Sequence, residues 1–355
     1  MVESEARGDV VVGLFREECA EGQRGRARVR ETPSVILPDS EAARDDGPAV
    51  AVRDLEHRYG DRQALTGVSL GVSRKEIFGL LGPNGGGKTT LFKILSTLLA
   101  ASGGSARVFG HELPREARHV RRHLGVVFQH PSLDPKLTVA ENLRHHGHLY
   151  GMRGAELRGR ADALLPRLGL AERARDRVET LSGGLQRRAE LAKALMHKPD
   201  LLLLDEPSTG LDPGARQDFV HYLERLRAEE GVTVLLTTHI LDEAEHCDRL
   251  GILHQGKLVA LGTPGELKSQ VGGDVVVIHS HTAEALKEKI RLRFGDEPLL
   301  VDGNLRIEMR EGHEFARAVV NAFGREVETV SFGKPTLEDV FIHLTGQRLW
   351  GEDGA

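Results

Sequence analysis

The chain has 355 residues, of which 39% are hydrophobic, and its formal net charge is -5. This length allows two domains with a sizeable core, whereas the net charge argues against a generally basic surface, so no nucleic-acid partner is expected. Two cysteines, Cys19 and Cys247, are too few for a disulfide scaffold and suit a reducing cytosol. No apolar run approaches the ~20 residues of a spanning helix and no signal-peptide core is seen, so any membrane crossing is expected in another chain.

The first segment, residues 1–48, is rich in Glu, Asp and Arg and has little periodicity. This composition predicts a disordered, charged extension. A series of arginines within it suits either a solvated tail or contact with anionic lipid or a partner, and its acidic neighbours favour the tail: Arg24, Arg26, Arg28 and Arg30. Ordered structure is expected to begin near Ala49, where apolar residues alternate as in a strand.

A phosphate-binding loop follows the apolar strand predicted at 77–81 and precedes a helical pattern. Its sequence matches G-x-x-x-x-G-K-[ST], in which glycines let backbone N–H groups converge on phosphate oxygens. Lys88 would neutralise the terminal phosphates and the Thr89 hydroxyl would bind Mg²⁺. A plain glycine turn is the disfavoured alternative. The loop predicts binding of ATP or GTP through Gly82, Pro83, Asn84, Gly85, Gly86, Gly87, Lys88, Thr89 and Thr90.

The segment between Gln129 and Ser182 is predicted to be mainly helical. Three histidines within it, His145, His146 and His148, lack companion ligands of a known metal site, so a solvated helix face is preferred there. At its end Ser182, Gly183 and Gly184 begin another helix, whose free N–H groups and serine hydroxyl suit an anion. A second anion site suggests that two copies of the chain share each nucleotide.

The run Leu201–Leu204 predicts a central parallel strand that is buried on both faces and ends in Asp205 and Glu206. Asp205 is expected to hold magnesium, through water, and Glu206 to polarise the attacking water. A strand that merely ends in two surface acids is the alternative. The second carboxylate favours hydrolysis over transfer to another substrate.

These motifs and their order resemble the ATP-binding cassette family, the nucleotide-binding subunits of ABC transporters, over about 50–263. Four further residues carry the resemblance: Gln129 is similar to the Q-loop glutamine, Asp212 lies in a D-loop pattern, His239 resembles the switch histidine, and Tyr59 the aromatic that stacks on adenine. Without the resemblance, Gln129 would read as a loop residue, His239 as a core histidine, and Tyr59 as packing under a turn. Two departures are Leu185 in place of the usual glutamine and Gly86 in place of alanine.

The resemblance implies an α/β, P-loop NTPase cassette over 49–268, with a RecA-like core, an antiparallel β subdomain and an α-helical subdomain at about 130–184. It implies ATP and Mg²⁺ as cofactors, with Thr89, Gln129 and Asp205 at the metal, and Lys88, Glu206 and His239 as catalytic groups. It also implies two nucleotide-binding subunits, identical or different, joined to an integral-membrane permease at the cytoplasmic face of the cell membrane.

After residue 263 the pattern changes, and 269–349 is predicted to form a small α+β accessory domain, followed by a tail over 350–355. Strands are expected at 275–278, 299–301, 305–309 and 327–332, and helices at 283–294 and 314–323. The last helix is capped by Thr336 with Asp339 three residues later. This ending resembles the daunorubicin-resistance type of ATPase subunit, which serves ABC-2 exporters; a structural closing helix is the alternative.

Two other functions remain open from the sequence. A soluble ABC ATPase of DNA repair or translation would normally show paired cassettes or a long insertion, and this chain has one compact cassette. A regulatory module that binds nucleotide without turnover is disfavoured because Glu206 and His239 are both present. The sequence therefore predicts an ATP-hydrolysing subunit that powers export, without indicating what is exported.

Overall fold

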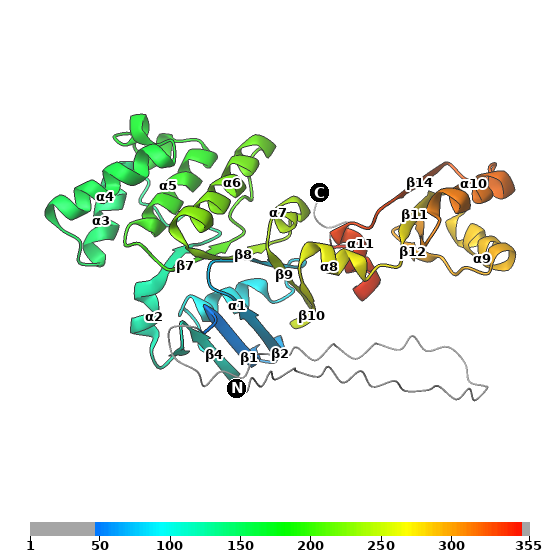
Figure 1. Cartoon of the computed structure of the whole chain (residues 1–355), viewed down its shortest axis with the longest axis horizontal. Helices are drawn as coiled ribbons and strands as arrows, with labels where there is room; N and C mark the ends of the chain where they lie inside the picture. Colours follow the sequence, from blue (N-terminus) through cyan, green and yellow to red (C-terminus); the bar gives the residue numbers. More distant parts are fainter. Residues whose placement is uncertain (1–46, 350–355) are drawn as a thin grey trace, which may run out of the picture. The chain divides into compact units, whose positions relative to one another are not determined.

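The computed structural model describes residues 47–349. The tail predicted at 350–355 and nearly all of the extension predicted at 1–48 lie outside these residues. Within the described part the strands form three sheets: an antiparallel sheet with strand order β2-β1-β4-β5, a central sheet with order β10-β9-β3-β8-β7-β6, and a C-terminal sheet with order β12-β13-β11-β14. Figure 1 shows the elements in chain order.

The central sheet contains five parallel strands and one antiparallel edge strand. Strand β3 runs parallel to both of its neighbours, β8 and β9, so the loop that follows it lies at their common carboxyl edge. Open α/β sheets place ligands at this edge. The strands are β3 (Ile77–Leu81), β6 (Leu124–Val127), β7 (Leu201–Asp205), β8 (Thr233–Thr238), β9 (Arg249–His254) and β10 (Lys257–Gly262).

The two faces of β3 pack into two different hydrophobic clusters. Phe78 and Leu80 pack with helix α1 (Lys88–Leu95) and the antiparallel sheet, whereas Ile77 and Leu81 pack with the helices of the other face. This follows from the period of two along a strand. A strand that is buried on both faces reads as an unbroken apolar run, which is why β3 and β7 were recognisable in the sequence.

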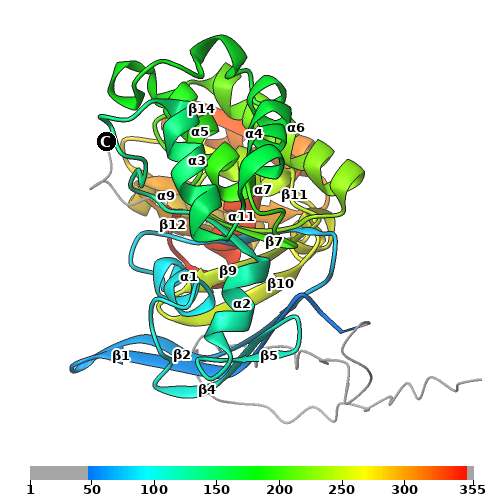
Figure 2. The ribbon, with the colours of Figure 1, turned by 90° about the vertical axis from the view of Figure 1, so that its left-hand side faces the viewer.

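The antiparallel sheet contains β1 (Val50–Tyr59), β2 (Arg62–Val72), β4 (Gly103–Val108) and β5 (His111–Leu113). Helix α2 (Ala117–His123) contacts β5 and leads directly into β6 of the central sheet. Figure 2 shows α2 between these two layers. The short helix therefore joins the antiparallel sheet to the strand that precedes Gln129.

The segment before Ser182 is largely helical, as predicted. It contains α3 (Val139–Leu149) and α4 (Gly154–Arg167), and α3 begins with a capping box formed by Thr138 and Glu141. The next helices are α5 (Gly183–Leu195), α6 (Pro213–Glu230), α7 (Leu241–Glu245) and α8 (Pro264–Ser269). Apolar residues of α3 to α6 share one core with the face of the central sheet that carries Ile77 and Leu81.

The C-terminal elements are β11 (Asp274–His279), α9 (Ala283–Phe294), β12 (Leu299–Val301), β13 (Asn304–Met309), α10 (Gly312–Phe323), β14 (Thr329–Gly333) and α11 (Leu337–Thr345). Each predicted strand and helix is present. The two larger boundary shifts are at α10, which begins two residues before the predicted 314, and at β14, which begins two residues after the predicted 327; the other boundaries agree to within one residue. The N–H groups of Glu326 and Val327 bond to the Phe323 carbonyl, so the chain is still turning at the end of α10.

Helix α11 joins the core of the cassette rather than that of the C-terminal sheet. Leu337, Val340 and Phe341 are fully buried among residues of the central sheet and α8. A separate cluster that includes Val276, Ile278 and α9 fills the C-terminal sheet. The apolar side of the last helix, which includes Leu337, Val340 and Phe341, thus packs against the cassette.

Candidate functional site

The phosphate-binding loop runs from the end of β3 to the start of α1. Gly85 and Gly87 have φ values of 79° and 108°, a region that L-residues with side chains rarely adopt. A Cβ atom at Gly82 would lie 2.2 Å from the Leu253 carbonyl oxygen. Glycine is therefore required here for backbone geometry and for close approach, and the first turn of α1 presents its N–H groups at the loop.

Lys88 begins α1 and is almost fully buried. Its Nζ donates to the carbonyl oxygens of Gly82 (2.7 Å) and Pro83 (3.2 Å) and lies 3.6 Å from Glu206 Oε1. Burial lowers the pKa of Lys88 from its ordinary value, whereas Glu206 acts in the opposite direction. The Lys88 ammonium is thus held inside the loop by carbonyl oxygens. A phosphate group bound in the loop would add its own oxygen atoms as acceptors.

Asp205 and Glu206 are both buried at the carboxyl end of β7. Thr237 of β8 donates to Asp205 Oδ1 at 2.6 Å and accepts from the Glu206 N–H at 3.0 Å, so one hydroxyl orients both residues. Burial raises the pKa of Asp205, and the Thr237 hydrogen bond opposes this shift. Glu206 has φ 46°, a left-handed conformation that is costly for a residue with a side chain and typical of functional positions.

Three side chains from separate elements surround the Glu206 carboxylate. Gln129, after β6, donates to Oε2 at 3.2 Å; His239, after β8, places Nδ1 3.4 Å from Oε1; and Lys88 approaches the same oxygen. His239, then Lys88, hold the pKa of Glu206 below its ordinary value despite burial. The sequence motifs that predicted these residues are far apart in the chain, but the sheet brings them to one carboxylate.

Arg187 of α5 is an important residue that the sequence reasoning missed. Its guanidinium donates to the carbonyl oxygens of Phe128 (2.6 Å), Pro207 (2.6 Å), Asp205 (3.0 Å) and Glu206 (3.1 Å). Burial lowers its pKa, and nearby acids, led by Glu190, oppose the shift. The planar fork with several N–H donors suits such a site. It ties the helix that begins at Ser182 to the loops that carry Gln129 and Glu206.

The start of α5 is exposed, and Ser182 accepts a weak hydrogen bond of 3.4 Å from the Leu185 N–H as its N-cap. Gln186, one place after the usual glutamine position, donates to the carbonyls of Val178 and Leu181. Its amide therefore closes the preceding turn instead of pointing away from the chain.

Two other predicted contacts lie in separate places. Asp212 caps α6 by accepting from the Ala215 N–H at 3.0 Å. Tyr59 lies at the end of β1 with 45% of its surface exposed, and its ring meets His57 edge to face at 4.6 Å. Tyr59 thus presents an aromatic face to solvent, while Asp212 has a structural partner in its own helix.

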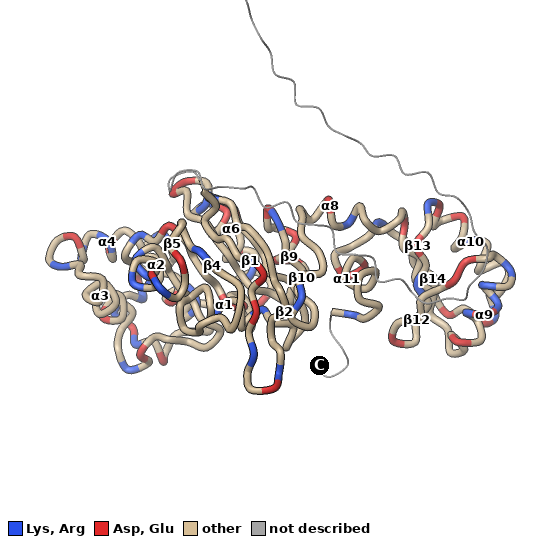
Figure 3. The backbone as a smooth tube through the Cα atoms, turned by 90° about the horizontal axis from the view of Figure 1, so that it is seen from below, with Lys and Arg blue, Asp and Glu red and all other residues tan. Residues whose placement is uncertain are grey.

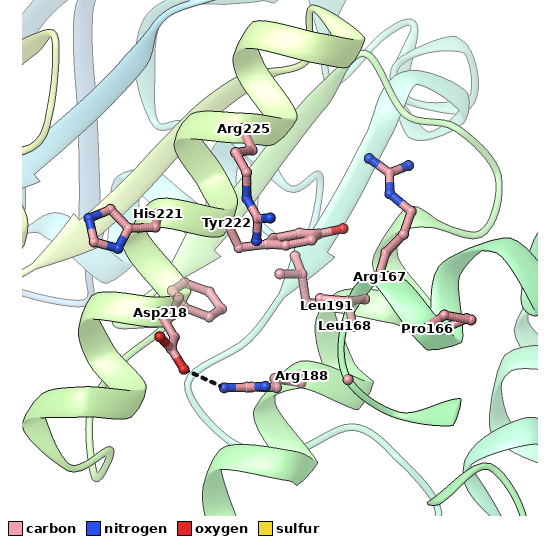
Figure 4. A pocket seen from close by; sticks show the side chains of 11 residues that line it. Pro166, Arg167, Leu168, Arg188, Leu191, Asp218, His221, Tyr222 and Arg225 are labelled. Atoms are coloured by element: carbon pink, nitrogen blue, oxygen red, sulfur yellow. Dashed lines mark hydrogen bonds and ion pairs between the residues drawn. The ribbon is translucent and has the colours of Figure 1, made fainter. Parts of the chain in front are cut away.

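A cavity of about 470 Å³ lies away from these loops, between the end of α4, the middle of α5 and α6 (Figure 4). Its arginines are largely paired: Arg188 Nη2 lies 3.0 Å from Asp218 Oδ2, and Arg167 Nη1 lies 2.5 Å from Glu230 Oε1. Arg225 lies over the Tyr222 ring. This cavity shares none of its lining residues with the phosphate-binding loop.

Two family models match parts of the cassette. A family model described as ABC transporter matches residues 65–209, and a model described as AAA domain, putative AbiEii toxin, Type IV TA system, matches 177–243. The solved structure of cbiO1 from Clostridium perfringens, part of an ABC transporter complex, is 27% identical and superposes with a TM-score of 0.59 over 70% of this chain and 96% of its own. The cassette fold predicted from the sequence is confirmed.

Curated relatives extend the match into the C-terminal elements. The daunorubicin resistance ATP-binding protein DrrA3 of Streptomyces coeruleorubidus is 41% identical over 84% of this chain and 96% of its own length. The linearmycin resistance ATP-binding protein LnrL of Bacillus subtilis is 36% identical over 83% and 98%. This chain therefore belongs to the ATP-binding subunits of ABC transporters and is an ATP hydrolase. Its resemblance to the daunorubicin-resistance type is confirmed.

Proposed function

We propose that this chain powers export through a separate integral-membrane permease of the ABC-2 type, at the cytoplasmic face of the membrane. The observation that carries the proposal is similarity over nearly the whole length of resistance ATP-binding proteins, including the segment after the cassette. No helix within residues 47–349 is long and apolar enough to cross a bilayer. A soluble ABC ATPase of DNA repair or translation is the competing function, and no observation favours it.

The residues at the carboxyl edge fit a nucleotide phosphate chain with Mg²⁺. The loop combines left-handed glycines, a buried ammonium and the first turn of α1, which together suit phosphate oxygens. Hydroxyl, amide and carboxylate oxygens are ligands that Mg²⁺ prefers, and Thr89, Gln129 and Asp205 supply them. The ion would neutralise charge that develops on the phosphates. Tyr59 is assigned to the adenine ring and Asp212 to the region near the phosphates.

Glu206 is assigned as the group that polarises the attacking water. Its pKa is held below the ordinary value, so the carboxylate is ionised at neutral pH and accepts a proton from water. Gln129 and His239 fix the position of this carboxylate, and His239 is also assigned to the terminal phosphate. Lys88 would compensate the negative charge of the phosphates as the bond breaks.

Two subunits, either identical or paired with a different one, are proposed to close head to tail around two ATP molecules. Ser182 is exposed at the N-terminus of α5 and is available to a second copy. The dimeric structure of MJ0796, a bacterial ABC transporter cassette, is 29% identical with a TM-score of 0.56 over 60% of this chain and 98% of its own. Closure and reopening would move the permease between two access states.

The substitution Glu206→Gln tests the assigned hydrolysis step. The glutamine amide has the same size and can still form hydrogen bonds, but it lacks the negative charge of the carboxylate. ATP binding should therefore persist while turnover falls by at least ~100-fold. Glu224→Gln is the matched control, because Glu224 lies on the exposed side of α6, where it pairs with His246. Normal turnover by Glu206→Gln would overturn the assignment.

The shared nucleotide site and the export function need different tests. Ser182→Arg should prevent dimer closure and hydrolysis while leaving initial ATP capture nearly unchanged; equal loss of both would refute the shared site. Co-purification of the subunit with a permease that stimulates its ATPase activity would support transport. Recovery of a solute-binding protein in the same complex would count against export.

A further inference from the structure

A cluster of potential metal ligands lies where the antiparallel sheet meets α2. His111 lies in β5, Glu116 precedes α2 as its N-cap, and His119 lies in the first turns of that helix. One ligand atom from each of the three residues lies within 4.8 Å of the others. No residue of the cluster belongs to the nucleotide site. These groups therefore form a local set that the hydrolysis mechanism does not use.

The cluster is partly ordered by contacts among its own members. The His111 and His119 rings stack with centroids 5.3 Å apart and an interplanar angle of 15°, so the two ring planes are nearly parallel. Glu116 Oε1 lies 3.2 Å from His111 Nδ1, while Oε2 accepts from the Glu112 N–H at 3.0 Å. The backbone hydrogen bond fixes the carboxylate, and small rotations of two side chains would bring three ligand atoms around one ion.

The neighbouring His123 supports the same arrangement from the next turn of α2. Its ring stacks at 6.2 Å on that of His111, and its Nδ1 lies 2.6 Å from Asp200 Oδ2. This bond anchors the end of the helix to the start of β7. His119 and His123 are four residues apart and hence lie on one face of α2. Figure 3 shows acidic and basic positions close together around β5 and α2.

We propose that His111, Glu116 and His119 bind one divalent transition-metal ion of the zinc type. Two imidazoles and one carboxylate form a donor set that zinc accepts in tetrahedral geometry, with a fourth position left to water. Imidazole also suits copper and nickel, whereas magnesium prefers oxygen ligands, so this site would differ from the magnesium site in the ion it selects. Metal ions bind imidazole in its neutral form.

The location gives the ion a structural effect. It would hold β5 of the antiparallel sheet against α2, and α2 continues directly into β6 and the loop with Gln129 (Figure 2). A ligand that binds the folded chain in preference to the unfolded chain stabilises the fold. Zinc is therefore expected to raise the melting temperature without entering the chemical step.

Calorimetric titration of ZnCl₂ into the untagged, metal-stripped, nucleotide-free full chain tests this site. We expect one equivalent of zinc to bind, with affinity at least tenfold weaker in His119→Ala and no saturable site in the variant with both His111→Ala and His119→Ala. Glu116→Gln keeps an acceptor for the Glu112 N–H but loses the charge, so it should also weaken zinc binding by at least tenfold. His145→Ala is the matched control, because it removes an exposed imidazole outside the cluster.

The melting temperature gives a second measurement on the same proteins. Zinc should raise it in the unsubstituted chain and in His145→Ala, and leave it unchanged in the variant that lacks both cluster histidines. Unchanged ATPase activity with Mg²⁺ would show that this variant is folded. Equal zinc affinity in the unsubstituted chain and the double variant would overturn the proposal, as would weak binding of several ions without a saturable single site.

Discussion

The carboxyl edge of the central sheet and the C-terminal sheet both bury charged groups, but they satisfy them differently. At the central sheet two adjacent acids, Asp205 and Glu206, are buried beside Lys88, and Glu206 has a left-handed backbone. At the C-terminal sheet Arg306 of β13 forms one ion pair with Asp339 of α11. Like charges and backbone strain indicate a site that acts on a ligand, whereas a neutral pair with ordinary backbone indicates a structural contact.

The largest expected effect is on the structural pair. Asp339→Asn keeps the capping hydrogen bonds but removes the charge, so the Arg306 guanidinium, which is 11% exposed, loses this ion pair. The free energy of unfolding of this region should fall by about 3 kcal/mol. Calorimetry would measure this loss, and Glu326→Gln, at an exposed pair with Lys289, should cost less than ~1 kcal/mol. Equal losses in the two variants would show that the pair of Arg306 and Asp339 stabilises the fold no more than an exposed ion pair does.

A smaller effect, on activity, is expected at the other edge. Arg187→Lys keeps the positive charge but cannot reach the same set of carbonyl oxygens, so the loops with Gln129 and Glu206 should lose their alignment. ATP turnover should fall by about 100-fold, equivalent to ~2.7 kcal/mol, with ATP affinity nearly unchanged. Arg188→Lys is the control, since that side chain pairs with Asp218 at the surface. Similar turnover in both variants would contradict the alignment role.

Arg187 and the sequence motifs together show which parts of the candidate site could be predicted from the sequence. The phosphate-binding loop and the acidic pair at the end of β7 are each contiguous in the sequence and each follow an apolar run. The sequence therefore predicts both their chemistry and their position in the fold, and it also predicts most of the C-terminal strands and helices. Arg187 and Thr237 act through distances to backbone atoms of other loops, and no spacing in the sequence reports such contacts. The same holds for His111 and His119, which belong to different elements.

Another comparison is between partly buried and exposed histidines. His146 and His197 lie near one another, the His197 ring stacks on Tyr150, and burial lowers the pKa of each histidine to about 4. In the unfolded chain these histidines have pKa values of ~6.5, so below that pH the unfolded chain binds more protons than the folded chain. Stability is thus fully present above about pH 6.5 and declines as the pH falls toward 4.

The measurement is the free energy of unfolding as a function of pH. Between pH 7 and 5 each of these two histidines should cost the unsubstituted chain about 2 kcal/mol of its free energy of unfolding. His197→Phe retains an aromatic ring against Tyr150 and should reduce the slope, whereas His221→Phe, at an exposed position of α6, should not. An unchanged slope in His197→Phe would mean that other groups cause the acid sensitivity.

The smallest effect is expected at the start of α11, the helix that joins the C-terminal segment to the cassette core. Thr336 accepts a hydrogen bond from the Asp339 N–H, and Asp339 accepts in return from the Thr336 N–H and hydroxyl. Thr336→Ala should cost about 1 kcal/mol of stability, because one orphan donor of the helix loses its acceptor. Thr282→Ala is the control, since Thr282 occupies the N-cap of α9 without a capping hydrogen bond. If both substitutions cost the same, the cap contributes nothing to the attachment of α11, and its buried apolar stripe alone holds the helix in place.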